Sequence, residues 1–371
     1  TRVCIEPRRV GGIKGEGMKM DVPIFEQYDY AEDHSLPNLG IQLNGNAKLR
    51  WYQEKAMGRM LRGQRARSGV VVLPCGAGKT LTGISTACSI NKPTLILCNN
   101  NLACKQWRDA FFHFSTATPD KVMCFSSENI PNIPANGSAI LLFATYSMFS
   151  VKEDKRSVQS LQVMKKIAAI EWGLVVLDEV HIAPAEEFRK AIYGVRSRCK
   201  LGLTATMVRE DGQVGDLNFL VGPKLYEANW MELTSQGYLA RVQCIEVPCP
   251  MSFESMTRYI SHEKARDKQE FYYTTNTNKI AACEALVRMH EERKDQILVF
   301  SDSVPLLLYC AKRMDREKMY GKTSEAERIE LFAMFKAKKI QTLLISRIGD
   351  VAVDLQRLNL LCLKHCKQFN P

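Results

Sequence analysis

The sequence predicts an α/β protein made of two doubly wound parallel-sheet domains, the second of which carries a small helical insertion. Short runs of consecutive apolar residues recur along the chain, and such runs are typical of strands covered on both faces of a parallel sheet. Stretches with a helical apolar period separate these runs, and the same alternation begins again after about residue 240. The chain has 371 residues, and a size of roughly 150 residues per domain also favours two domains.

The first domain is expected to cover residues 47–235, after an N-terminal arm formed by residues 1–46. The arm is rich in Gly, Pro, Asp and Asn, which are typical of irregular backbone. In the first domain the predicted strands are residues 69–73, 94–97, 139–143, 174–177 and 200–203, and the predicted helices are residues 80–90, 103–114 and 185–196.

The second domain is expected to cover residues 236–371. Its predicted strands are residues 296–300 and 342–345, and its predicted helices are residues 278–293 and 324–336. The interval 252–276 is polar, charged and aromatic, which indicates an inserted lobe within this domain.

Composition excludes several classes of protein. With 46% apolar and 25% charged residues, the chain is neither a disordered tail, nor a collagen, nor a disulfide-stapled miniprotein. Its 13 cysteines are scattered without a C-x-x-C pair, which indicates reduced thiols. No apolar run reaches the roughly 18 residues that span a bilayer, so no membrane partner is expected. The net charge of +11 suggests a polyanionic partner without proving one.

The strongest functional signal is the segment LPCGAGKT at residues 73–80, between a Val-rich stretch and a helical one. In such a loop the glycines let backbone N–H groups close around phosphate oxygens, the lysine reaches the outer phosphates, and the threonine hydroxyl serves Mg²⁺. Leu73 stands where a strict P-loop has its first Gly, and an incidental Lys in a Gly-rich turn is the alternative interpretation. The predicted nucleotide ligands are Gly76, Ala77, Gly78, Lys79 and Thr80.

A second signal follows the predicted strand 174–177, which runs directly into the sequence DEVH. Acids after strands are common, but after a P-loop at this distance they suit a magnesium ligand and a residue that polarises the attacking water. We assign Asp178 to Mg²⁺, together with Thr80, and Glu179 to the water. His181 is expected to couple this site to the rest of the protein, although a lone His is more often structural.

Two further polar groups have expected roles near the nucleotide. Thr204 and Thr206, at another strand end, could sense the phosphate, and ordinary strand-end capping is the alternative. Gln53, about 25 residues before the loop, has an amide that both donates and accepts and so could recognise the adenine edge.

The order GAGKT, DEVH and TAT resembles the superfamily 2 helicases and translocases. More specifically, residues 65–80, 171–181, 201–211 and 216–232 look like the XPB family, and the resemblance runs from about Asp21 to Leu355. XPB is the DNA translocase subunit of the transcription and repair factor TFIIH. The resemblance implies two RecA-like domains that bind ATP and Mg²⁺ between them, and a thumb-like lobe at about 252–276.

The resemblance also implies roles for individual residues. Arg50 and Gln53 match the family's adenine-reading element, with Trp51 in place of its Pro. The segment 209–211 matches an Arg-Glu-Asp element implicated in DNA engagement, whereas its spacing alone indicates a solvated charged loop. The residues carried over as nucleotide, DNA or coupling contacts are Arg50, Thr204, Thr206, Arg209, Glu210, Asp211, Gly321, Thr323, Ser324 and Asp350.

One family motif is not found. The family continues to a Gln-Arg-x-Gly-Arg-x-x-Arg motif whose arginines approach the γ-phosphate, but here Gln356-Arg357-Leu358 is followed by Asn-Leu-Leu. Such an arginine finger can contribute a factor of about 10³–10⁵ in rate. Either the second domain is incomplete at its C-terminus, or the chain is a divergent paralog without the finger.

The expected function is therefore that of an ATP-dependent double-stranded DNA translocase and 3'-5' helicase of XPB type. The resemblance implies a nuclear protein that opens promoters and nucleotide excision repair sites within TFIIH, beside other subunits such as p52/p8-type regulators. The alternative is a paralog that binds ATP, hydrolyses it poorly and acts as a structural subunit. A DEAD-box RNA helicase fits less well, because the DEVH and Arg-Glu-Asp segments follow the XPB pattern.

Overall fold

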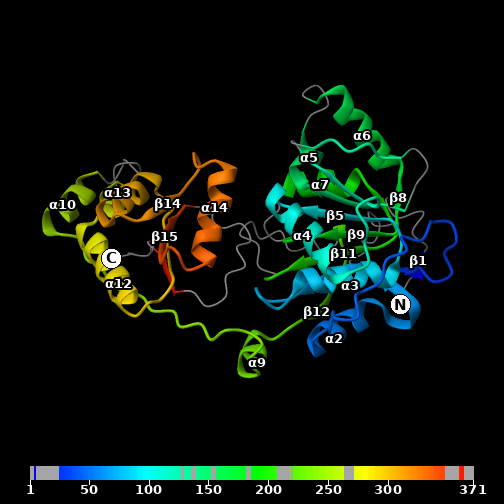
Figure 1. Cartoon of the computed structure of the whole chain (residues 1–371), viewed down its shortest axis with the longest axis horizontal. Coiled ribbons are helices and arrows are strands. Elements are labelled where there is room, and N and C mark those ends of the chain that lie inside the picture. Colours follow the sequence, from blue (N-terminus) through cyan, green and yellow to red (C-terminus); the bar gives the residue numbers. More distant parts are fainter. Residues whose placement is uncertain are drawn as a thin grey trace. The chain divides into compact units, whose positions relative to one another are not determined.

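The computed structural model describes residues 4–5, 25–126, 129–134, 139–151, 156–180, 185–206, 218, 220–262, 271–346 and 359–362 (Figure 1). Two compact units divide the chain, Thr1–Leu239 and Ala240–Pro371. Each unit contains its own parallel β-sheet, which confirms the predicted α/β class. None of the helices in these ranges combines the length and apolar character required to cross a membrane.

The first unit is built on a seven-stranded sheet with the strand order β12-β4-β11-β9-β5-β7-β6. Every neighbouring pair in it is parallel. The strands are β4 (Gly69–Val72), β5 (Thr94–Cys98), β6 (Val122–Phe125), β7 (Leu141–Thr145), β9 (Leu174–Leu177), β11 (Lys200–Thr204) and β12 (Lys224–Glu227).

Helices cover both faces of this sheet, because the central strands carry apolar side chains on both of their faces. Val71 and Ile96 face one core with the helices α2 (Trp51–Met60), α3 (Lys79–Ile90) and α4 (Asn101–Phe114). Their neighbours Val70 and Leu95 face a second core, which is completed by the helices α5 (Tyr146–Ser150), α6 (Val158–Ala169) and α7 (Ala185–Tyr193). The smaller elements of this unit are β1 (Cys4–Ile5), β2 (Phe25–Asp29), η2 (Arg62–Gln64), β3 (Arg65–Arg67), β8 (Glu171–Trp172), β10 (Arg196–Ser197) and α9 (Trp230–Ser235).

Part of the expected N-terminal arm packs on the first unit. Strand β2 pairs antiparallel with β3, and Leu39 and Ile41 are buried in the core. The ammonium group of Lys92 donates hydrogen bonds to the carbonyls of Asp33 and Leu36 at 2.7 and 3.1 Å. Residues 25–46 are therefore held against the first unit by ordered contacts, although the backbone after β2 has almost no regular secondary structure.

The second unit contains a four-stranded parallel sheet with the order β14-β15-β13-β16. Its strands are β13 (Ile297–Phe300), β14 (Glu317–Met319), β15 (Thr342–Ile345) and β16 (Asn359–Cys362). One face packs against α12 (Thr277–Glu292) and α13 (Val304–Met314), and the other against α14 (Glu325–Lys336). The predicted inserted lobe, residues 252–276, contains the helix α10 (Phe253–Ser261).

Candidate functional site

The three strands at the centre of the site end at the same edge of the first sheet. Strand β11 pairs with β4 on one side and with β9 on the other, and all three run parallel. The loop 73–78 therefore leaves β4 beside Thr204 at the end of β11, and Asp178 follows β9 one strand further on. The carboxyl edge of an open α/β sheet is where such folds bind ligands.

The loop after β4 has the backbone shape of a phosphate cradle. Gly76 and Gly78 have φ angles of +77° and +82°, a backbone region that residues with a Cβ rarely adopt. A Cβ placed on Gly78 would lie 2.4 Å from Nε2 of Gln53, so the position also lacks room for one. Helix α3 begins at Lys79 directly after Gly78, and its first N–H groups provide the positive end that favours an anion.

An ion pair joins this loop to the acidic segment after β9. Nζ of Lys79 lies 2.8 Å from Oε1 of Glu179, and their side chains are only 12% and 25% exposed. Glu179 has a φ angle of +48°, which is uncommon for a residue with a side chain. The structure thus brings together the lysine expected to bind phosphate and the glutamate expected to polarise water.

Asp178 is fixed at three of its atoms. Its N–H donates to the carbonyl of Leu97 at 2.9 Å, its carbonyl accepts from the hydroxyl of Tyr146 at 2.9 Å, and its Oδ2 accepts from Nε1 of Trp107 at 2.8 Å. Burial raises the pKa of the Asp178 carboxyl to about 6, and the bond from Trp107 opposes that rise. Trp107 was not among the predicted site residues, and it lies within the predicted helix 103–114.

The donor groups present suit the predicted nucleotide and Mg²⁺. Asp178 and Thr80 offer a carboxylate and a hydroxyl, which are the oxygen donors that Mg²⁺ prefers, and Mg²⁺ usually takes its remaining ligands from phosphate and water. Among the residues that the structure describes, no cluster of three or more His, Cys, Asp or Glu side chains could hold a metal alone.

Gln53 supports the phosphate loop from α2. Its Nε2 donates to the carbonyls of Ala77 and Gly78 at 3.1 and 3.2 Å, and its Oε1 accepts from the N–H of Arg50 at 2.8 Å. Tyr52 adds a hydrogen bond from its hydroxyl to the Ala77 carbonyl at 3.0 Å. Both sides of the Gln53 amide are therefore engaged within the protein, and adenine recognition by this residue stays a prediction.

The Arg50 side chain lies over aromatic rings near the end of the first unit. Its guanidinium carbon is 5.2 Å from the centroid of the Tyr238 ring, and one of its nitrogens donates to the hydroxyl of Tyr52 at 3.1 Å. The Tyr52 and Tyr238 rings meet edge to face, with centroids 5.6 Å apart. This aromatic surface beside Arg50 was not expected from the sequence, where Tyr238 follows the predicted domain boundary.

Local turns hold the remaining predicted contacts that the structure describes. The hydroxyl of Thr204 donates to the carbonyl of Thr206 at 2.6 Å. In the second unit, Thr323 accepts from the N–H of Tyr320 at 3.1 Å, and Ser324 caps α14 by accepting from the N–H of Glu327 at 3.3 Å. Gly321 is exposed in the same strand-to-helix turn after β14. The predicted site residues His181, Arg209, Glu210, Asp211 and Asp350 lie outside the described residues.

The described part of the inserted lobe has aromatic side chains on its surface. Phe253 on α10 is 90% exposed, and the Tyr259 and Tyr273 rings lie 6.4 Å apart. Arg258 forms an ion pair with Glu254 at 2.6 Å, which offsets its charge. These groups suit the stacking part of a nucleic-acid surface better than its phosphate-binding part.

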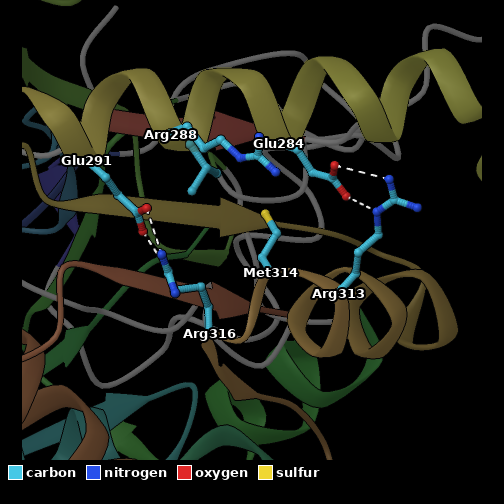
Figure 2. A pocket seen from close by; sticks show the side chains of 7 residues that line it. Glu284, Arg288, Glu291, Arg313, Met314 and Arg316 are labelled. Atoms are coloured by element: carbon cyan, nitrogen blue, oxygen red, sulfur yellow. Dashed lines mark hydrogen bonds and ion pairs between the residues drawn. The ribbon is translucent and has the colours of Figure 1, made fainter.

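A small pocket of about 160 Å³ lies in the second unit between α12, the end of α13 and the start of β14 (Figure 2). Two ion pairs line it, Glu291 with Arg316 and Glu284 with Arg313. Glu291 also accepts from the hydroxyl of Thr342 at 2.6 Å, which ties α12 to β15. None of the predicted site residues lines this pocket, and its charges largely satisfy one another.

Two family models match the chain. Residues 46–209 match the model described as type III restriction enzyme, res subunit, and residues 233–365 match the model described as ERCC3/RAD25/XPB C-terminal helicase. The two matches together contain the phosphate loop, the Asp178–Glu179 segment and the four-stranded sheet.

Curated relatives carry the same name in several organisms. The chain is 43% identical over 352 residues to the Dictyostelium discoideum protein named general transcription and DNA repair factor IIH helicase/translocase subunit XPB, covering 95% of this chain and 44% of that protein. Identity to the subunit named XPB/SSL2 of Saccharomyces cerevisiae is 43%, covering 92% of this chain and 40% of that protein. Identity to the subunit named XPB of Danio rerio is 44%, covering 93% of this chain and 43% of that protein. The chain thus spans less than half the length of these relatives.

Among solved structures, the helicase domain of Hef from Pyrococcus furiosus is similar in fold, with a TM-score of 0.51 and 12% identity. The alignment covers 84% of this chain and 89% of that one. At this identity the likeness concerns the fold alone, and it agrees with RecA-like α/β architecture. Together, the findings show that residues 233–365 form an ERCC3/RAD25/XPB C-terminal helicase domain and that the chain is similar to XPB subunits over more than nine-tenths of its length.

Proposed function

We propose that this protein is an ATP-dependent double-stranded DNA translocase and 3'-5' helicase of XPB type. Within TFIIH it opens promoters and nucleotide excision repair sites in the nucleus. The names of the relatives support this proposal, and they do not favour the alternative of a structural subunit that hydrolyses ATP poorly.

The observation that carries the proposal is the convergence of loop and acids at one sheet edge, joined by the Lys79–Glu179 ion pair. This ion pair holds the ammonium group of Lys79 beside the phosphate loop. When nucleotide binds, Lys79 exchanges its partner for phosphate oxygens, which releases Glu179 to orient the attacking water.

Asp178 and Thr80 would hold the magnesium ion, which neutralises developing charge on the phosphates. The protein itself positions these two ligands. Asp178 follows β9 and is held by three hydrogen bonds, and Thr80 lies next to Lys79 in the first turn of α3.

For the nucleic acid, the proposal assigns phosphate contacts to Gly321, Thr323 and Ser324, and engagement of the DNA to the Arg-Glu-Asp segment 209–211. Backbone N–H groups and hydroxyls of this kind position a protein on a DNA backbone without reading its sequence. Other TFIIH subunits, including p52/p8-type regulators, are the proposed protein partners.

The test is ATP hydrolysis by this chain with and without duplex DNA, in wild type and in Lys79→Ala. We expect DNA to stimulate hydrolysis, and Lys79→Ala to reduce the rate at least roughly 10²-fold because charge stabilisation at the phosphates is lost. Lys165→Ala, which removes an exposed lysine of α6, is the matched control and should leave the rate unchanged.

DNA-stimulated hydrolysis that persists in Lys79→Ala would contradict the site assignment. Nucleotide binding without measurable hydrolysis in the wild type would instead favour the structural-subunit alternative. Stimulation by RNA rather than by duplex DNA would point to an RNA helicase.

A further inference from the structure

Trp107 donates a hydrogen bond to the Asp178 carboxylate itself, whereas Tyr146 bonds to the backbone carbonyl of Asp178. Trp107 lies on α4, is 2% exposed, and donates from Nε1 to Oδ2 of Asp178 at 2.8 Å. An indole nitrogen can only donate, so this bond is made to an accepting carboxylate oxygen and favours its ionised form.

The ring of Trp107 is wedged against the helix that carries the phosphate ligands. A Cβ placed on Gly83 of α3 would lie 2.6 Å from Cη2 of Trp107, so the missing side chain of Gly83 makes the space that the indole fills. On its other side the ring packs near Phe111, with centroids 6.3 Å apart. Such packing leaves the indole little freedom to turn.

The same side chain therefore contacts Asp178 directly and packs against α3 at Gly83, three residues after Thr80 in the same helix. Through its ring it sets the spacing to α3, which begins with Lys79 and Thr80. Through its N–H it fixes the rotation of the Asp178 carboxylate, occupying Oδ2 and leaving the remaining acceptor positions of the group for other ligands.

We propose that Trp107 is a positioning residue for nucleotide-bound magnesium, which orients the Asp178 carboxylate and holds it at a fixed distance from α3. The proposal rests on the proposed function, because it assumes that a magnesium nucleotide binds at this edge of the sheet. Groups that hydrogen-bond a metal-ligating side chain typically contribute roughly 10- to 100-fold to metal affinity or activity.

The first experiment compares Trp107→Phe with Trp172→Phe. Phe keeps an aromatic ring and removes the N–H in both cases. Trp172 is a matched control because it is fully buried in the same unit, lies in β8 before the start of β9 whereas Asp178 follows the end of β9, and donates its N–H to the carbonyl of Ile167 at 3.2 Å. Binding of a non-hydrolysable ATP analogue is measured by calorimetry, first with a chelator and then at rising Mg²⁺.

We expect Trp107→Phe to bind the metal-free analogue as the wild type does, and to need roughly 10- to 100-fold more Mg²⁺ for the metal-dependent gain in affinity. Trp172→Phe should match the wild type in both measurements. An unchanged Mg²⁺ requirement in Trp107→Phe would overturn the proposal. A wild type that binds no analogue under either condition would contradict the proposed function instead.

A second measurement uses the intact chain and so does not depend on how the variant folds. The protein is labelled with ¹⁵N at its four indole groups, saturated with the analogue in chelator, and then given Mg²⁺. The Trp107 indole resonance is assigned in the wild type from its through-space contacts with Phe111, and it should shift more than the resonance that is missing in Trp172→Phe. A Trp107 resonance unmoved by Mg²⁺ would overturn the proposal even if the Phe variant failed to fold.

Discussion

Asp178 in the first unit and Glu291 in the second are carboxylates that their surroundings treat in opposite ways. Burial raises the pKa of Asp178 to about 6, against the hydrogen bond from Trp107. Arg316 lowers the pKa of Glu291 below its ordinary value by donating two hydrogen bonds at 2.7 and 2.9 Å (Figure 2). One carboxylate is oriented by a neutral donor, and the other is matched by a cation.

The difference separates a group that is placed to meet a cation from a group that holds the fold together. At the first site, Lys79 pairs with Glu179, so the donor to Asp178 is an indole that does not neutralise its charge. At the second, each of the two carboxylates that line the pocket has an arginine partner, and Arg288 adds a third positive charge. The absence of a cationic hydrogen-bond partner at the sheet edge, within the described part of the chain, therefore supports the role proposed for Asp178.

Replacing a glycine of the phosphate loop should have the largest effect. Gly78→Ala introduces a Cβ at φ +82° and 2.4 Å from the Gln53 amide. We expect a loss of about 1–2 kcal/mol in the free energy of unfolding from backbone strain alone. Nucleotide affinity should fall more than about tenfold, since the N–H groups of the cradle are displaced. Urea denaturation and calorimetry measure the two effects.

The control for this change is Gly58→Ala, on α2. A Cβ there meets nothing within 4 Å, and the residue lies inside a helix. Alanine should stabilise the chain by roughly 0.5–1 kcal/mol and leave nucleotide affinity unchanged. Equal effects of the two substitutions would contradict the special geometry assigned to Gly78.

Gln53→Ala should have an intermediate effect that also tests adenine recognition. It removes hydrogen bonds to the carbonyls of Ala77 and Gly78, so we expect a loss of about 1–2 kcal/mol in the free energy of unfolding. If the amide only supports the loop, affinities for ATP and GTP fall together. A fall confined to ATP would support the adenine contact. Gln236→Ala, which changes an exposed glutamine bonded to Trp51, serves as the control.

The smallest effect is expected at the matched carboxylate of the second unit. Because the folded pKa of Glu291 is below the ordinary 4.5, its ionised form stabilises the unit at neutral pH, and this contribution is lost as pH falls from about 4.5 through the folded value. Glu291→Gln should therefore cost about 1 kcal/mol at pH 7 and less below pH 4.5. Hydrogen exchange of the β13 and β15 amides measures it.

Glu254→Gln gives the comparison for that experiment, since it breaks an ion pair whose side chains are 76% and 59% exposed. Such a pair contributes on the order of 0–0.5 kcal/mol. A pH dependence in Glu291→Gln as steep as that of the wild type would show that the pair with Arg316 does not set the stability of this unit.

The parallel sheets could be predicted because their central strands are apolar at every position. Strands β5, β9 and β15 lie where the sequence placed them, within a residue. Strands β12 and β14 were missed because Lys-Leu-Tyr-Glu and Glu-Lys-Met are polar segments at sheet edges, where only one neighbour pairs with them. The packed segment 25–46 was missed because its contacts depend on distant partners such as Lys92.

The candidate site was predictable where chemistry requires particular residues at a fixed spacing. Lys79, Asp178 and Glu179 could be placed at one edge because parallel strands end together. The supports of that site could not: Trp107 and Tyr146 contact Asp178 from helices 71 and 32 residues away in the chain. Nothing in a buried aromatic residue's local sequence distinguishes a hydrogen-bonding role from packing.

The hydrogen bonds from Tyr52 and Gln53 to the loop have a thermodynamic consequence. They order the backbone around Ala77 when the domain folds, so the loop has little conformational freedom left to lose when a ligand arrives. Nucleotide binding should then carry a small entropic penalty and a small change in heat capacity. The conformational entropy of the loop is therefore lost during folding and not during binding. Because Tyr52 and Gln53 lie on α2, a less stable α2 should lower the affinity for nucleotide.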